Sequence, residues 1–180
     1  MNLKILRMIV VMVILLNIPT AFAWTTFSDP SSGFQADFPC TPLKQEGSIL
    51  DRNIKAYSCE ESFRDSLILY QVNIASKING DEIRYKKSDV SLALKNYIIG
   101  NLVVYGVSQN NITFKPIADF QNKFPAVFYY TNAMKGGVSA EGISSLINGK
   151  HMKIGIMYEP TIKDEAKSRL QHFLNSFKLQ

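Results

Sequence analysis

The closing stretch of the chain, residues 148–179, most constrains what this sequence can fold into. Asn148-Gly149 is typical of a tight hairpin turn, and apolar and polar side chains alternate through Lys150–Tyr158, as in a β-strand. Past Pro160, apolar residues recur at helical spacing. These residues are Ile162, Ala166, Leu170, Phe173, Leu174 and Phe177. A helix with one apolar stripe must cover an apolar surface, so we predict that the upstream chain forms a sheet beneath it.

The two faces of the predicted strand Lys150–Tyr158 differ in polarity. The side chains predicted to face the core are Met152, Ile154, Ile156 and Tyr158. Those predicted to face outward are His151, Lys153 and Gly155. At the start of the helix, Thr161 followed by Asp164 resembles a capping box, with Asp where Glu or Gln is usual. Asp164 and Glu165 also suit the positive end of the helix dipole.

Upstream, alternating apolar and polar residues predict a series of short strands. Their ranges are 24–27, 33–38, 54–60, 67–75, 111–118, 124–132 and 138–147. Pro39 and Pro42 should end regular pairing between the second and third of these strands. Residues 61–66 read as a connection, and Gly136-Gly137 as a turn. The strand at 124–132 is apolar on both faces, which suits a central strand covered above and below.

A helix is predicted at Val90–Ile99, with Ser88 as its N-cap and Asp89 placed to favour its N-terminus. Gly100-Asn101 is its expected end, although residues 102–105 could add a further turn. The order of elements indicates an α+β domain, with helices packed on a mainly antiparallel β-sheet.

The first 23 residues have the features of a secretory signal peptide. Basic residues precede the apolar run Met8–Leu16, and Ala21-Phe22-Ala23 fits the small-x-small cleavage rule. The apolar run is shorter than the roughly 20 residues of a transmembrane helix, and an uncleaved anchor is the alternative. We predict cleavage between Ala23 and Trp24, leaving a single domain at residues 24–180 that is exported to the periplasm or the extracellular space.

The composition excludes several classes of function. Hydrophobic residues make up 46% and charged residues 19%, ordinary values for a globular protein, which excludes disorder. Removing Lys4 and Arg7 from the 20 basic residues leaves 18 against 15 acidic ones, a net charge of +3. The basic residues are scattered among acidic ones, so we predict no nucleic-acid partner.

The two cysteines, Cys40 and Cys59, both lie in the part of the chain predicted to be exported. An even number of cysteines in an exported protein favours a disulfide. Closing a loop of this size stabilises a fold by about 3 kcal/mol in the chain-entropy model. A redox-active pair is the alternative, but the sequence has no C-x-x-C motif. We therefore predict one structural disulfide.

Three short motifs resemble those of a known family. Phe34–Pro42 resembles the F-x-V-x-F-P-x-x-P start of small exported bacterial proteins with a PsbP-like α/β/α sandwich. Phe124–Tyr130 resembles their P-A-x-x-Y-x-Y strand, and Phe173–Phe177 resembles their final helix. PsbP itself is an extrinsic subunit of photosystem II, and nothing in this sequence indicates photosynthesis. The resemblance implies the sandwich fold; most bacterial relatives of this type have no assigned reaction, so it implies no mechanism.

No motif for catalysis or metal binding is present. The two histidines, His151 and His172, are predicted to lie on the surface, and G-x-S-x-G, H-E-x-x-H, EF-hand and C-x-x-C patterns are absent. We therefore predict no catalytic residues, no metal site and no cofactor. For a ligand pocket, Tyr70, Tyr129 and Tyr158 are the first candidates for its wall, because tyrosine suits a boundary between apolar and wet surroundings.

These features together predict a non-enzymatic exported protein that binds a small ligand or another protein of the envelope or extracellular space. No stable membrane span is expected after cleavage. One alternative is an exported hydrolase-type enzyme with an unrecognised site, using His151 with an acidic neighbour. A second alternative is a secreted factor that acts on host cells.

Overall fold

The structure, a computed structural model, describes residues 23–49, 52–76 and 87–180. The predicted signal peptide, apart from Ala23, lies outside the described residues, as does most of the polar stretch that follows β5. In chain order the elements are β1 (Thr25–Asp29), β2 (Phe34–Phe38), β3 (Leu43–Ile49), β4 (Arg52–Phe63), β5 (Ser66–Ala75), α2 (Lys87–Val103), β6 (Thr113–Pro116), β7 (Ala126–Thr131), β8 (Ser139–Ile147), β9 (Lys150–Tyr158), α3 (Lys163–Ser176) and β10 (Lys178–Leu179).

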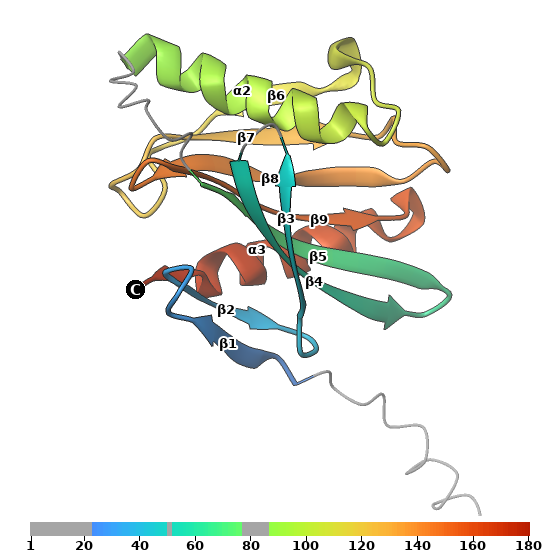
Figure 1. Ribbon diagram of the computed structural model, residues 1–180. Coiled ribbons are helices and arrows are strands. Elements are labelled where there is room, and N and C mark those ends of the chain that lie inside the picture. The colour runs from blue at the N-terminus through green and yellow to red at the C-terminus, as the bar shows by residue number, and fades with distance from the viewer. Residues whose placement is uncertain (1–22, 50–51, 77–86) are drawn as a thin grey trace, which may run out of the picture.

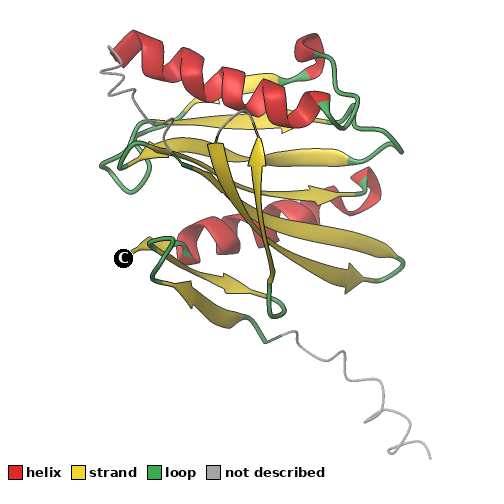
Figure 2. Ribbon diagram, in the orientation of Figure 1, coloured by secondary structure: helices red, strands yellow, loops and turns green. Residues whose placement is uncertain are grey.

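The elements form layers around one large antiparallel sheet (Figure 1). Its seven strands run in the order β3-β4-β5-β9-β8-β7-β6. Helix α2 lies on one face, over β7, β8 and β9, and α3 lies on the other. A small sheet of order β1-β2-β10 packs against α3 on that second face (Figure 2). The predicted fold class, an antiparallel sheet flanked by helices, is confirmed.

The hairpin turn and the apolar stripe of the closing unit fold as the sequence pattern predicts. Asn148 and Gly149 both have positive φ, at 50° and 76°, and they turn β8 into β9. The apolar stripe of α3 faces the sheet and the small β-sheet, with its members buried or partly buried. Phe173 packs edge-on against Phe38 at 4.9 Å between ring centroids, and Phe177 stacks on Phe34 at 5.3 Å.

The capping box predicted at the start of α3 is wrong. Residues Pro160–Ile162 form a 3₁₀ turn, so Thr161 lies within that turn rather than at the helix cap. Ile162 is the N-cap residue, and no side chain hydrogen bonds to the cap. Asp164 and Glu165 do lie in the first turn, as predicted from the dipole.

Strand β9 is the central strand, and both of its faces are buried, so the outward placement of His151, Lys153 and Gly155 is wrong. These residues face α2, which covers the polar side of the strand. Conversely, the strand predicted to be central, β7, is second from the β6 edge. Alternation of polar and apolar residues normally indicates that the polar face of a strand meets solvent. Here a helix from elsewhere in the chain covers that face.

The boundaries of other elements differ from those predicted. Strand β3 has no apolar period and was not predicted, while Pro39 and Pro42 do lie between β2 and β3. Strand β4 extends through Phe63, which pairs with Ser66, so the connection is the tight turn at residues 64–65. Helix α2 continues past Gly100 to Val103, the longer of the two expected ends.

The predicted disulfide between Cys40 and Cys59 is confirmed. It joins the segment after β2 to β4, and so fastens the small sheet to the large one. Across the described ranges, no helix combines the length and the apolar character needed to cross a membrane.

Candidate interaction surface

Tyr70, Tyr129 and Tyr158, the candidates for a pocket wall, are all buried, and they lie on opposite faces of the large sheet. Tyr70 and Tyr158 belong to the core between the sheet and α3, whereas Tyr129 belongs to the core beneath α2. Burial raises the pKa of all three phenols. The structure therefore does not bring the three side chains together around one ligand.

The hydroxyl of Tyr70 holds a buried carboxylate. It donates a hydrogen bond to Glu61 Oε2 at 2.6 Å, and Arg169 Nη1 on α3 lies 2.7 Å from Glu61 Oε1. The Arg169 guanidinium also lies 5.0 Å from the centroid of the Phe63 ring. Because Glu61 is fully buried, the arginine compensates a charge that water cannot reach, and the group fastens β4 and β5 to α3. Sequence patterns place Glu61 in a connection and so did not indicate this site.

Tyr129 lies across a pair of glycines in the middle of the sheet. Tyr129, Gly142 and Gly155 occupy one row across β7, β8 and β9. A Cβ at Gly155 would lie 2.5 Å from the Tyr129 hydroxyl and 2.5 Å from the Glu141 carbonyl oxygen. Glycine inside a strand usually marks such a close approach, and this was the one available sequence signal. Tyr129 therefore has a packing role.

Lys153 lies beneath α2 with only 2% of its surface exposed. Asn73 on β5 and Ser144 on β8 are its neighbours across the sheet, and its Nζ is 3.5 Å from Gln71 Oε1. Burial lowers the pKa of Lys153 to about 8. Within the part of the chain that the structure describes, neither an ion pair with Lys153 nor a hydrogen bond to the buried Ser144 hydroxyl is found. This polar layer is enclosed, so it offers no accessible surface to a ligand.

The two histidines have different surroundings. His151 is buried between β9 and α2, edge-on to Tyr97 at 5.0 Å between ring centroids, so its predicted surface position is wrong. His172 is exposed, as predicted; its ring lies 4.3 Å from that of Trp24, and its Nε2 is 3.7 Å from Asp37 Oδ2. A substrate would have to displace α2 to reach His151.

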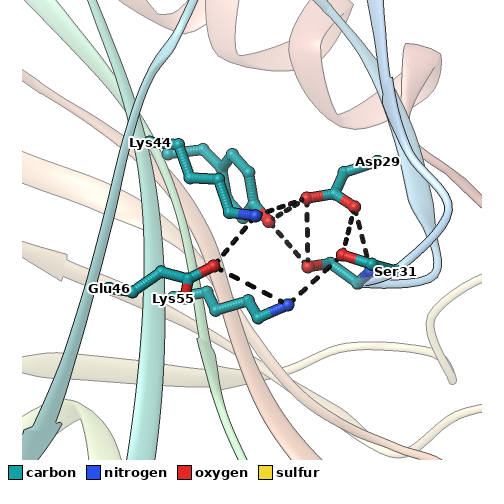
Figure 3. A network of polar contacts seen from close by, with 7 residues as sticks. Asp29, Ser31, Lys44, Glu46 and Lys55 are labelled. Atoms are coloured by element: carbon teal, nitrogen blue, oxygen red, sulfur yellow. Dashed lines mark hydrogen bonds and ion pairs between the residues drawn. The ribbon is translucent and has the colours of Figure 1, made fainter.

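The turn between β1 and β2 is held by a network of polar contacts that Figure 3 shows from close by. Asp29 accepts hydrogen bonds from Tyr57 and from Ser31 Oγ, the latter at 2.6 Å. Lys44 Nζ lies 3.3 Å from Asp29 Oδ2 and 2.9 Å from Glu46 Oε1. Burial would raise the pKa of the Asp29 carboxyl, but the hydrogen bonds from Ser31, Tyr57 and Lys44 outweigh it and hold that pKa well below its usual range. The network fastens the small sheet to β3 and β4.

The outer side of α2 carries apolar side chains that the fold leaves exposed. The inward residues Val90, Leu94, Ile98 and Leu102 are buried, as the helical period requires. Exposed apolar residues lie on the opposite side of the helix and in the turn that follows it: Leu92, Val103, Val104 and Tyr105. We call these four the α2 apolar surface. Val104 is 78% exposed, and in Figure 1 the helix forms the outermost layer on its side of the sheet.

The layers define a class of fold, an antiparallel sheet with helices on both faces and a small accessory sheet. No family model matches the chain, and no curated protein matches it. Among solved structures, the chain is similar to the solution structure of cyanobacterial PsbP (CyanoP) from Synechocystis sp. PCC 6803. The TM-score is 0.54 and the identity 13%, over 91% of this chain and 96% of that one. This similarity confirms the PsbP-like fold that the sequence motifs imply.

Proposed function

We propose that this chain is an exported protein without enzymatic activity, and that it acts by binding a protein of the envelope or extracellular space through the α2 apolar surface. The observation that carries the proposal is the exposure of Leu92 and Val103 on the outer side of α2, and of Val104 and Tyr105 in the turn that follows the helix. Val103, Val104 and Tyr105 are consecutive in the chain and all exposed, and exposed apolar patches commonly mark a surface that another protein covers.

The placement of Glu61, Lys153 and His151 supports a binding role over a catalytic one. Glu61 is neutralised by Arg169, and Lys153 and His151 lie beneath α2. A general base or nucleophile must reach its substrate within hydrogen-bond distance, which enclosure by a helix prevents. The disulfide is compatible with an oxidising compartment, and so with the proposed export.

The binding site is tested with residues 24–180 carrying Val103→Lys and Val104→Lys together. Lysine suits the C-terminal end of a helix, so the fold should be kept. Burial of an apolar side chain of this size stabilises a complex by about 1.5 kcal/mol or more, so loss of both valines should weaken binding roughly tenfold or more. Leu67→Lys is the matched control, because Leu67 is 52% exposed and Val103 is 53% exposed.

Two variants of residues 24–180 would be prepared, one with a photo-crosslinking residue at position 104 and the other with the same residue at position 67. Each variant would then be added to the native envelope and medium. The expected result is a protein crosslinked from position 104 but not from position 67, whose binding the double variant loses and Leu67→Lys retains. Equal binding by wild type and the double variant would refute the α2 apolar surface as the site.

Export is tested separately on the full chain. Fractionation followed by N-terminal sequencing should yield a mature protein that begins at Trp24 in the periplasm or the medium. Recovery of the chain in the cytoplasm with its first 23 residues intact would overturn the export proposal.

A further inference from the structure

Strand β3 forms an open edge of the large sheet. It pairs with β4 along its whole length, from Leu43 opposite Ser58 to Ile49 opposite Arg52. On its other side, no strand of the described ranges pairs with it. The side chains from Leu43 to Ser48 are all exposed. An edge strand of this kind presents a row of backbone N–H and C=O groups to a second strand.

We propose that β3 pairs with β3 of a second copy of this chain, antiparallel, about a twofold axis that passes through Gln45. The two seven-stranded sheets then form one continuous sheet across the axis. Such an interface is isologous, because each copy contributes the same strand. A second copy is inferred as the partner because the sequence of β3 is complementary to itself in this one register.

Charge selects the register. With Gln45 opposite Gln45 of the second copy, Lys44 lies opposite Glu46 of the second copy, and the reverse pair lies on the other side of the axis. Opposite charges directly across an antiparallel pair are favourable. The neighbouring registers that keep the hydrogen-bonding pattern are shifted by two residues in either direction. They place Lys44 opposite Lys44 of the second copy, or Glu46 opposite Glu46. Like charges directly opposite are unfavourable, so both alternatives are disfavoured.

The other face of β3 is complementary in shape. In the same register Leu43 lies opposite Gly47 of the second copy. Leu43 is 61% exposed in the single chain, and no atom lies within 4 Å of where a Cβ on Gly47 would be. Each leucine can therefore pack over the glycine of the other copy, which removes apolar surface from water.

The existing polar network is compatible with this pairing. Lys44 and Glu46 point to the face of the sheet where Asp29 lies. Lys44 Nζ is 2.9 Å from the Glu46 oxygen and 3.3 Å from the Asp29 oxygen. The glutamate of the second copy would lie on that same face, because residues directly opposite in a β-pair share a face. The network in Figure 3 thus continues across the axis instead of being broken by it.

Cysteine crosslinking of residues 24–180 tests the register. In Gln45→Cys the new thiol lies on the axis, where opposed Cα atoms are about 5 Å apart, within the range that a disulfide spans. In Gly47→Cys the thiol lies opposite Leu43, and the two copies of residue 47 are roughly 13 Å apart along the strands. Cys40 and Cys59 are already paired with each other, so they do not compete. Mild oxidation should give a covalent dimer with Gln45→Cys and none with Gly47→Cys.

Charge reversal provides the second test, by analytical ultracentrifugation over a range of concentrations. Glu46→Lys makes both cross-axis pairs repulsive and should raise the dimer dissociation constant on the order of tenfold. Lys44→Glu should do the same with the opposite sign of charge. A mixture of the two variants should form mixed dimers, because each lysine then meets a glutamate. Circular dichroism checks that each variant is folded, and the cysteine pair decides the question if one is not.

The proposal is overturned by a monomer at every concentration without crosslinking of Gln45→Cys, by equal crosslinking of both cysteine variants, or by a dimer that Val103→Lys with Val104→Lys abolishes. The last result would place self-association on α2 instead. Because the partner-binding variants lie on α2 and these lie on β3, the two proposals fail independently.

Discussion

Replacing Lys153 with methionine should stabilise the folded chain, because this lysine is buried without a charged partner among the described residues. Burial lowers the pKa of its ammonium group from 10.5 to about 8. At about 1.4 kcal/mol per pKa unit, this corresponds to about 3 kcal/mol of destabilisation while the lysine is protonated. Methionine has a similar volume and fills the same space beneath α2 without a charge. We expect Lys153→Met to raise the free energy of unfolding at pH 7 by about 2 to 3 kcal/mol.

The pH dependence of the free energy of unfolding follows from the lowered pKa of Lys153. Below pH 8 the lysine is protonated in both the folded and the unfolded chain, so the wild type bears the full cost. Between pH 8 and 10.5 the folded chain releases its proton while the unfolded chain still binds one, so wild-type stability rises with pH. The difference between wild type and Lys153→Met should therefore be constant below pH 8 and should close by pH 10.5.

Urea unfolding followed by circular dichroism at a series of pH values measures this difference directly. Lys167→Met is the matched control, because Lys167 is exposed on α3, and it should be neutral within about 0.5 kcal/mol. If Lys153→Met is no more stable than wild type at pH 7, or if the difference persists unchanged to pH 10.5, the inference that the charge is uncompensated is wrong.

Three further substitutions test other parts of the fold. Gly155→Ala places a Cβ 2.5 Å from a backbone oxygen of β8 and should cost more than about 2 kcal/mol by urea unfolding, whereas Gly47→Ala, where the space is open, should cost less than about 1 kcal/mol. Arg169→Met leaves the Glu61 charge buried without its ion-pair partner and should lower the free energy of unfolding by about 3 kcal/mol. A second change, Glu61→Gln, should restore most of this loss. No recovery would refute the pairing. Asp29→Asn should lower the free energy of unfolding by about 1 kcal/mol above pH 4. Because the pKa of the folded-state carboxyl is lowered, this difference from wild type should vanish as acid protonates that carboxylate. A difference that grows in acid would contradict this.

The local patterns of the sequence predicted the hairpin turn and the helix of the closing unit well. The hairpin at Asn148-Gly149 depends on two residues that tolerate positive φ, and the α3 stripe depends on a helical period. Both signals are contained in a few neighbouring residues. The disulfide was also predictable, because two cysteines allow only one pairing.

Failures of prediction have a common physical cause, which is that burial is decided by remote elements. Lys153 and His151 alternate with apolar residues as on a half-exposed strand, and only the position of α2 shows that they are covered. The same holds for Glu61, whose partner Arg169 lies more than 100 residues further along the chain. Strand β3 carries the opposite problem: it is exposed on both faces, so it leaves no apolar period to detect.

The two helices distribute polarity in opposite ways, and this distinguishes the two faces of the sheet. Helix α3 turns its apolar stripe to the sheet and exposes Lys163, Asp164 and Lys167 to water, while Arg169 reaches inward to Glu61. Helix α2 covers a layer that contains Lys153 and Ser144, yet it leaves Leu92 and Val103 exposed on its outer side. Leu92 and Val103 are 60% and 53% exposed, so more than half of the surface of each side chain lies outside the core. The proposed binding surface on α2 rests on this difference between the two helices.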